Sequence, residues 1–184
     1  NQNFINILMY KGKKIALVIP CYKVSSIIND VISSTPNFID KIYVVDDRCP
    51  ENSAKKIKSK SKKIKKIYRK TNGGVGAAVK DGYKFSLREN NHITVRIDGD
   101  GQMDLKLIKG FIDPIIKKKA GFTKGNRFMD LTFIKIMPPL RIIGNIFFSL
   151  IGNLVIKNIK IFDFLNGYTS IDNNALKKVL KTNL

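Results

Sequence analysis

Thr94-Val95-Arg96-Ile97-Asp98-Gly99-Asp100-Gly101-Gln102 is an apolar run that leads directly into two carboxylates spaced two residues apart. In an extended backbone, residues i and i+2 point to the same side, so this spacing predicts that Asp98 and Asp100 share one divalent cation. Gln102 adds a neutral oxygen, and such a ligand set suits Mg²⁺ or Mn²⁺. Asp-Gly-Asp-Gly is also common in plain turns, so these residues alone leave that alternative open.

Strand and helix patterns alternate through the first half of the chain. Apolar runs predict strands at residues 14–19, 41–45, 64–68 and 93–97, and helical patterns predict helices at 24–34, 51–60 and 77–87. Strands separated by helices form parallel sheets, so the fold class is predicted to be α/β with a mostly parallel sheet flanked by helices.

The predicted strands end in polar groups. Pro20-Cys21-Tyr22 follows the first strand, Asp46-Asp47 the second, and Asp98 stands after the fourth. Ligands of such sheets bind beyond the carboxyl ends of the strands. This convergence favours the metal interpretation of Asp98 and Asp100 over the plain turn.

The second half continues with a helix at 105–116, a short strand at 121–124, a helix at 140–157 and a final helix at 173–181. The length of 184 residues suits one domain of ordinary size, so residues 1–184 are expected to form a single domain.

The chain is strongly basic, with a formal net charge of +20 from 34 basic and 14 acidic residues. An anionic partner is therefore expected. Ten of the basic residues crowd residues 55–70, and no aromatic residue interleaves them until Tyr68. The missing stacking platforms disfavour single-stranded nucleic acid. A solvated basic face and attraction to an anionic membrane surface remain as alternatives.

Cysteine and histidine are scarce. The two cysteines are too few for a disulfide scaffold, which indicates a reducing, cytosolic setting. His92 is the only histidine, which argues against histidine-based acid–base chemistry and against a histidine-ligated metal. The longest uncharged run, residues 142–156, is shorter than the roughly 20 residues that cross a bilayer. It is expected to lie against a core or a membrane surface.

Six short motifs, in order along the chain, resemble those of the family two glycosyltransferases of the GT-A fold, in particular the polyprenyl-phosphate sugar synthases. They are Val18-Ile19-Pro20-Cys21-Tyr22, Val44-Val45-Asp46-Asp47, Asn72-Gly73-Gly74-Val75-Gly76-Ala77-Ala78, Asp98-Gly99-Asp100-Gly101-Gln102, Gly125-Asn126-Arg127 and Asn166-Gly167-Tyr168. The fourth is similar to the family's Asp-x-Asp metal motif. The resemblance covers most of the chain.

The resemblance implies roles for individual residues. A nucleotide-binding role falls on Pro20, Tyr22, Asp46, Asp47, Gly76 and Asp98. Asp98, Asp100 and Gln102 would hold Mg²⁺ or Mn²⁺ and the donor diphosphate, with Asp100 counted among the catalytic residues. Arg127 and Arg141 would face phosphate groups of the donor or acceptor, a role that suits a planar charged fork. A plain surface charge is the less favoured alternative for each arginine in so basic a chain.

The function implied is inverting, metal-dependent transfer of a sugar from a UDP or GDP sugar to an acceptor. A polyprenyl phosphate at the cytoplasmic face of a membrane is the expected acceptor, with a glycan as the other possibility. The competing hypothesis is a non-catalytic module that binds nucleic acid or an anionic surface through its charge.

Two departures from the family pattern bear on this function. Arg48-Cys49-Pro50 follows Asp47 where the family continues Gly-Ser, which leaves the nucleotide open. The chain also stops before the region where many relatives carry an acidic pair that supplies a base. Either it is a fragment, or the reaction needs no side-chain base.

Overall fold

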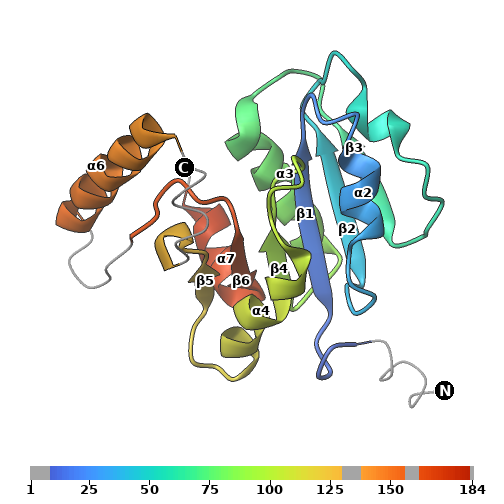
Figure 1. Cartoon of the computed structure of the whole chain (residues 1–184). Coiled ribbons are helices and arrows are strands. Elements are labelled where there is room, and N and C mark those ends of the chain that lie inside the picture. The colour runs from blue at the N-terminus through green and yellow to red at the C-terminus, as the bar shows by residue number, and fades with distance from the viewer. Residues whose placement is uncertain (1–8, 130–137, 156–161, 183–184) are drawn as a thin grey trace. The chain divides into compact units, whose positions relative to one another are not determined.

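The computed structural model describes residues 9–129, 138–155 and 162–182, which form an α/β fold around one sheet (Figure 1). The strands are β1 (Ile15–Cys21), β2 (Lys41–Asp46), β3 (Ile64–Tyr68), β4 (Ile93–Arg96), β5 (Phe122–Lys124) and β6 (Thr169–Asp172). The α-helices are α2 (Ile28–Ser33), α3 (Gly74–Arg88), α4 (Ile108–Ile116), α6 (Pro139–Val155) and α7 (Asn173–Lys181), with short 3-10 helices η1 (Ser53–Lys56), η2 (Leu105–Leu107) and η3 (Arg127–Met129).

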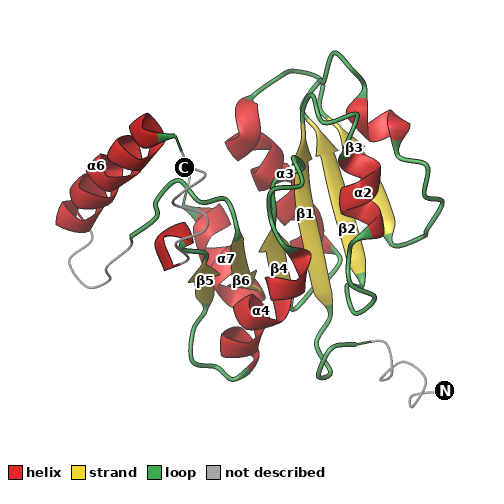
Figure 2. Cartoon of the chain, in the orientation of Figure 1, coloured by secondary structure: helices red, strands yellow, loops and turns green. Residues whose placement is uncertain are grey.

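The sheet has the strand order β3-β2-β1-β4-β6-β5 (Figure 2). The pairs β1–β2, β2–β3 and β1–β4 are parallel, and β4–β6 is antiparallel. The predicted α/β class with a mostly parallel sheet is confirmed. Because the chain leaves β1 for β2 on one side and later places β4 on the other, the sheet has its topological switch point between β1 and β4.

Strand β1 lies at the centre and is buried on both faces, as expected of a strand covered by helices on both sides. Ile15, Leu17 and Ile19 belong to the larger core, into which α2 and α4 pack. Ala16 and Val18 belong to a smaller cluster with Tyr83 and Phe85 of α3. Helix α7 contacts α3, so α3 and α7 cover one face of the sheet and α2 and α4 cover the other.

Three details differ from the sequence-based expectations. The predicted helix at 51–60 is only the 3-10 turn η1, because apolar positions at helical spacing are too few there to hold a longer helix on the sheet. Helix α3 begins at Gly74 rather than at residue 77, so the glycine-rich stretch is its first turn. Strand β6 falls in a stretch for which no strand was expected, and its partner β4 is distant in sequence.

Contacts divide the chain into two compact units. The first comprises residues 1–123 and 168–184 and holds most of the sheet. The second comprises residues 124–167 and holds η3 and α6. The expectation that residues 1–184 act as one catalytic domain stays a prediction.

Candidate active site at the carboxyl ends of the strands

The loops that follow β1 and β4 meet at the switch point. A Cβ added to Gly99 would lie 3.1 Å from the backbone oxygen of Pro20 and 3.4 Å from a methyl group of Ile19. A side chain at this position would be tightly packed against the backbone of β1, so glycine favours the close approach. The first and fourth predicted motifs are therefore brought into contact, with Gly99 as the contact point.

Strand β4 ends at Arg96, so Asp98, Asp100 and Gln102 stand on a turn beyond it rather than on extended backbone. Strand alternation therefore does not set the directions of the two carboxylates, contrary to the sequence-based argument. The turn is held by the backbone N–H of Gln102, which donates to Asp100 Oδ1 at 3.1 Å, and by Gly101 at φ +74°. Asp100 and Gln102 are exposed and Asp98 is partly exposed.

The donor set of this turn fits a divalent cation that also binds a diphosphate. Mg²⁺ is commonly held by one or two carboxylates, with substrate phosphates and water completing its shell. Asp98, Asp100 and Gln102 offer such a partial set of oxygens. Within residues 9–129, 138–155 and 162–182, no group of three or more His, Cys, Asp or Glu side chains gathers into a closed metal cage.

Arg96 is a neighbour of this site that the sequence reasoning missed. Its Nη2 donates to Asp98 Oδ1 at 3.0 Å, and its buried Nε has no hydrogen-bond partner within the described part of the chain. The arginine thus stabilises the charge of Asp98 while occupying one of its two oxygens. Its position two residues before Asp98 was the available signal.

Asp46 and Asp47 are both buried, and each has backbone partners. Asp46 accepts from the N–H groups of Cys49 at 2.7 Å and Ala54 at 3.3 Å, so it shapes the loop between β2 and η1. Asp47 accepts from the N–H of Gly73 at 3.0 Å and from Arg69 Nη1 at 2.5 Å. Asp46 and Asp47 therefore organise the loops that follow β2 and β3, and their predicted role in nucleotide binding stays a prediction.

Arg69 is a second residue that the sequence reasoning missed, because it lay within the lysine-rich run. It bridges two carboxylates: its Nη1 pairs with Asp47, and its Nε donates to Asp81 at 2.9 Å. Hydrogen bonds to Asp47 and then Asp81 raise the pKa of its guanidinium. A Cβ on Gly73 would approach Arg69 Nη1 to 2.6 Å. Gly73 thus lets the end of β3 and the start of α3 close around Asp47.

The remaining predicted residues of this region differ in exposure. Pro20 is partly buried at the end of β1, and Tyr22 is 43% exposed. Gly76, in the first turn of α3, is exposed, and a Cβ added there would meet no atom within 4 Å. Cys49 accepts from the N–H of Lys23 at 3.0 Å, which ties the β1 loop to the β2 loop. The structure thus brings the first four motifs to one edge of the sheet.

In the second unit, Arg127 is bound by the buried carboxylate of Asp163. Nε and Nη2 of Arg127 donate to the two oxygens of Asp163 at 2.9 and 2.8 Å, and the backbone N–H of Arg127 donates at 3.0 Å. Asn145 of α6 donates to the same carboxylate at 2.6 Å. Burial alone would raise the pKa of Asp163, but the hydrogen bonds from Arg127 and Asn145 lower it to about 2. Asp163 was not among the predicted site residues.

Arg141 lies in the first turn of α6, but its side chain is not described, so its predicted phosphate contact stays a prediction. The motif residue Asn166 is buried, and its backbone oxygen accepts a hydrogen bond from Lys124.

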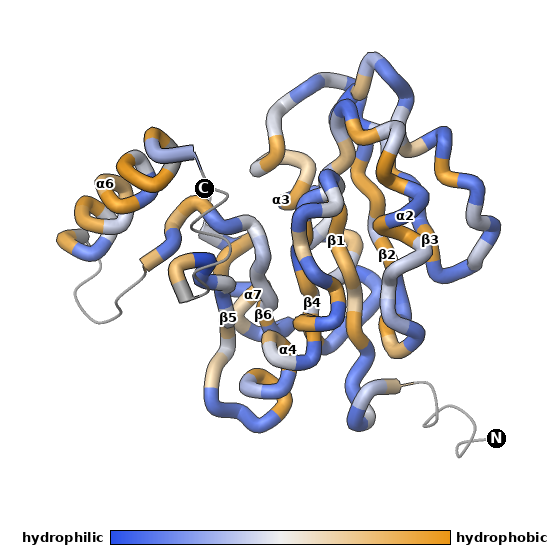
Figure 3. The backbone as a smooth tube through the Cα atoms, viewed as in Figure 1, coloured by the Kyte–Doolittle hydropathy of each residue, from blue (hydrophilic) through white to orange (hydrophobic). Residues whose placement is uncertain are grey.

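Helix α6 has polar groups on the side that contacts Asp163 and Phe162, and exposed apolar groups on its other sides. Asn145 and Ser149 are buried, and the Ser149 hydroxyl donates to the backbone oxygen of Phe162 at 2.8 Å. Apolar residues cover most of the rest of the helix, as the orange of α6 in Figure 3 shows. Those that are 44–82% exposed are Leu140, Ile143, Ile146, Phe147, Phe148, Leu150, Ile151 and Leu154. Among the described helices, none is long and apolar enough to cross a bilayer.

The sequence was compared with models of known protein families. The sequence profile of Glycosyl transferase family 2 matches residues 16–180. The chain therefore belongs to glycosyl transferase family 2.

Two relatives match most of the chain in sequence. One is the UDP-N-acetylglucosamine–dolichyl-phosphate N-acetylglucosaminyltransferase of Methanococcus voltae, which is 28% identical over 181 residues, covering 90% of this chain and 72% of that protein. The other is an uncharacterized protein of Methanocaldococcus jannaschii, 25% identical over 168 residues, covering 91% of this chain and 68% of that protein.

Solved structures share the fold. Glucosyl-3-phosphoglycerate synthase from Mycobacterium tuberculosis, in complex with Mn²⁺, UDP and glucosyl-3-phosphoglycerate, superposes with a TM-score of 0.65 at 16% identity over 89% of this chain. Mannosyl-3-phosphoglycerate synthase from Rubrobacter xylanophilus gives 0.65 at 16% identity over 90%. The chain spans 58% and 55% of these two structures. The GT-A fold expected from the motifs is confirmed.

Proposed function

We propose that this chain transfers a sugar, with inversion, from a nucleoside-diphosphate sugar to the phosphate of a polyprenyl phosphate. The observation that carries the proposal is the contact of the Asp98–Gly99–Asp100 turn with the end of β1 at Pro20, at the switch point of a family two fold. Ligands of such sheets bind at this place. The dolichyl-phosphate relative supports the lipid-phosphate acceptor, and the UDP complex of the glucosyl-3-phosphoglycerate synthase supports a UDP sugar as donor.

The loops of the first unit would bind and orient the donor. Asp98, Asp100 and Gln102 would hold Mg²⁺ or Mn²⁺, which supplies positive charge to the departing diphosphate. Asp47, fixed by Arg69 and by the N–H of Gly73, would border the nucleoside. Because these carboxylates are already oriented by neighbours, little reorganisation is needed when the donor binds.

The acceptor chemistry follows from the scarcity of bases. His92, the only histidine, is exposed at the start of β4, where its Nδ1 accepts from the N–H of Lys14 at 2.9 Å. A hydroxyl acceptor requires a base within hydrogen-bond reach, whereas a phosphate oxygen is already anionic at neutral pH. A lipid phosphate can therefore attack without a protein base.

The exposed apolar side of α6 gives the proposed acceptor a second support. Exposed contiguous apolar surface marks contact with a protein or membrane partner. An interfacial helix buries such a side into the headgroup region, where a polyprenyl phosphate resides. The net charge of +20 adds attraction to anionic lipids. We therefore infer a peripheral association with a membrane surface through α6.

Transfer is tested by incubating the chain with radiolabelled UDP-N-acetylglucosamine, UDP-glucose or GDP-mannose, a short polyprenyl phosphate and Mn²⁺. The proposal predicts a labelled, chloroform-extractable product with one of the donors. Polyprenol without the phosphate should give much less product, because its hydroxyl must lose a proton before it can attack, whereas the phosphate oxygen is already anionic. Equal transfer to polyprenol and to its phosphate would contradict the proposed acceptor.

A further inference from the structure

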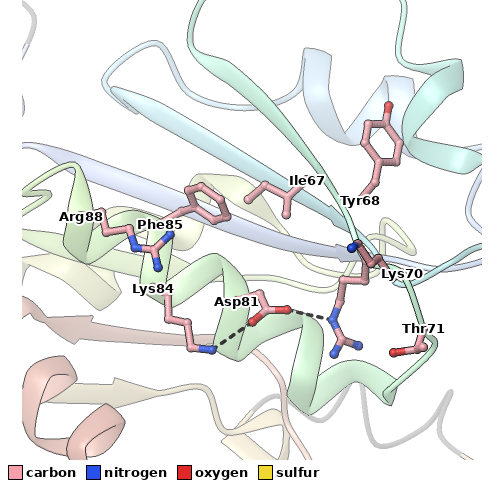
Figure 4. Close-up of a pocket in the computed structure, with 9 residues that line it drawn as sticks. Ile67, Tyr68, Lys70, Thr71, Asp81, Lys84, Phe85 and Arg88 are labelled. Carbon is pink, nitrogen blue, oxygen red and sulfur yellow. Dashed lines mark hydrogen bonds and ion pairs between the residues drawn. The ribbon is translucent and has the colours of Figure 1, made fainter.

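A second concave surface lies at the edge of the sheet, between the end of β3 and the outer side of α3. This pocket of about 340 Å³ is lined by Ile67, Tyr68, Arg69, Lys70, Thr71, Asp81, Lys84, Phe85 and Arg88 (Figure 4). It has four cationic side chains and one carboxylate. Pro20, Asp98, Asp100 and Gln102, which border the proposed metal and donor site, are not among its lining residues.

The charges in this pocket are only partly neutralised within the protein. Asp81 takes both Arg69 Nε at 2.9 Å and Lys84 Nζ at 3.3 Å, and Arg69 also pairs with Asp47. Lys70 and Arg88 have no carboxylate partner within the described part of the chain. Lys70, Lys84 and Arg88 are all exposed. The pocket therefore presents excess positive charge to solvent.

The pocket differs from the rest of the lysine-rich run in how its cations are used. Lys63 and Lys66 donate to the backbone oxygens of Asn37 and Ile57, and Lys65 pairs with Glu89. These contacts hold the edge strand and its flanking loops. The cations of the pocket lie beside the apolar side chains of Ile67 and Phe85. Arg88 lies 5.5 Å and Lys65 Nζ 4.5 Å from the centroid of the Phe85 ring.

We propose that this pocket binds the phosphate group of a phosphate ester, with Lys70, Lys84 and Arg88 as its ligands. Lys70, Lys84 and Arg88 all line this pocket. Cationic side chains are the usual partners of phosphate, and Arg supplies a planar fork for its oxygens. The organic part of the ester lies against Ile67 and Phe85. A free phosphate ester and an acidic lipid headgroup share this chemistry. The pocket contains none of the proposed metal ligands, but Arg69 joins it to Asp47 of the donor site. The variants below therefore leave Arg69 in place, so that phosphate binding is measured independently of the proposed transferase activity.

The first test uses inorganic phosphate and two charge-matched double variants. Lys70→Glu/Lys84→Glu changes the pocket, and Lys58→Glu/Lys60→Glu makes the same change in net charge at exposed positions elsewhere in the run. Phosphate is titrated while amide chemical shifts are followed by NMR. In the wild type and in the control pair, the amide signals of Thr71, Lys84 and Phe85 should shift with phosphate until they saturate. The pocket pair should bind at least about tenfold more weakly, because two attractions become repulsions.

Equal weakening in both pairs would overturn the proposal, because it would show diffuse attraction to net charge. The absence of saturable shifts in the wild type would overturn it as well.

A further variant predicts the opposite sign. Asp81→Asn removes the only carboxylate among the lining residues and releases both Lys84 and Arg69 Nε, so phosphate should bind about threefold or more tightly. Unchanged or weaker binding would contradict the assigned geometry, provided that the thermal midpoint of the variant stays close to that of the wild type.

Vesicle flotation distinguishes the two sources of phosphate. If the ligand is a headgroup, the wild type and the control pair should float with phosphatidate vesicles more than the pocket pair does. If the ligand is a free ester, both pairs should float alike while glycerol 3-phosphate reproduces the NMR shifts with wild type. The proposal would be overturned if the two pairs floated alike and glycerol 3-phosphate caused no shifts in the wild type.

Discussion

Asp163 is the buried carboxylate on which the conformation of Arg127 depends. Its pKa of about 2 lies below the ordinary value of 3.8, because the hydrogen bonds of Arg127 and Asn145 outweigh the cost of burial. A carboxyl group with a lowered pKa stabilises the folded state above its unfolded pKa, and this contribution is lost as pH falls through the folded pKa. The window for this residue is therefore between about pH 4 and pH 2.

We expect Asp163 to contribute about 2 kcal/mol to the free energy of unfolding at neutral pH, relative to acid. Urea unfolding from pH 6 to pH 2 should show this loss in the wild type. In Asp163→Asn the loss should be smaller by that amount. The variant should also be less stable at pH 6, because Arg127 loses its partner. An identical pH dependence in the two proteins would show that the carboxylate is not held as described.

A substitution at Gly76 can distinguish an effect on nucleotide binding from an effect on folding. A Cβ at this position would meet no protein atom within 4 Å, and alanine favours a helix over glycine. Gly76→Ala should therefore keep or raise the thermal midpoint. If the nucleotide occupies the space beside the first turn of α3, the same variant should bind UDP or GDP more weakly by calorimetry. Unchanged nucleotide affinity would remove Gly76 from the binding site.

At the scale of elements, the packing of α3 on the sheet depends on Gly82. A Cβ at Gly82 would lie 2.4 Å from Val18 Cγ1, inside the smaller core cluster. Gly82→Ala should lower the free energy of unfolding by about 1–3 kcal/mol through overpacking. The matched control is Gly110→Ala in α4, where a Cβ meets nothing and the change should stabilise by about 0.5–1 kcal/mol. Equal effects of the two substitutions in urea unfolding would contradict the close approach of α3 to β1.

Helix α6 gives a prediction about membranes. Phe147→Glu/Leu150→Glu places charge on its exposed apolar side, where the two residues are 58% and 62% exposed. Flotation with vesicles that contain anionic lipid should fall severalfold relative to wild type. Leu107→Glu/Val179→Glu, at exposed apolar positions of the first unit, is the control and should float nearly as well as the wild type. A similar loss in both variants would point to net charge rather than to α6.

The elements also show what a sequence can and cannot predict. Central strands were predictable because β1 and β2 are buried runs of apolar residues bounded by polar groups. Helix α7 was predicted at its observed bounds, because Asp172 caps it and its apolar spacing is helical. Strand β6 was not predictable, since four residues carry little pattern and their partner β4 is far away in sequence. The 51–60 segment was wrongly predicted as a helix because, beside its helix-favouring lysines, it offers only Ala54 and Ile57 to the core.

At the site, the motifs predicted which loops converge but not which side chains are already engaged. The pairing of Asp47 with Arg69 joins the end of β2 to the end of β3, and the pairing of Arg127 with Asp163 crosses 36 positions. Such contacts arise from the fold and leave no local spacing in the sequence. Arg96 is the exception, because it lies two residues from its partner.

For the whole molecule, the central proposal is that the turn with Asp98 and Asp100 binds the donor nucleotide together with a metal ion. UDP and GDP, each with and without Mn²⁺, are titrated by calorimetry into the wild type, Asp100→Ala and Asp113→Ala. Asp113 is the control, because it lies on α4 and pairs with Lys11 at 2.9 Å. Each variant loses one carboxylate, so a difference in net charge does not separate them, and the thermal midpoint of each is measured beside its affinity.

We expect one nucleotide to bind in the presence of Mn²⁺, with affinity lost by at least about tenfold in Asp100→Ala and retained in Asp113→Ala. Binding that needs no Mn²⁺ and survives Asp100→Ala would contradict the account of this site.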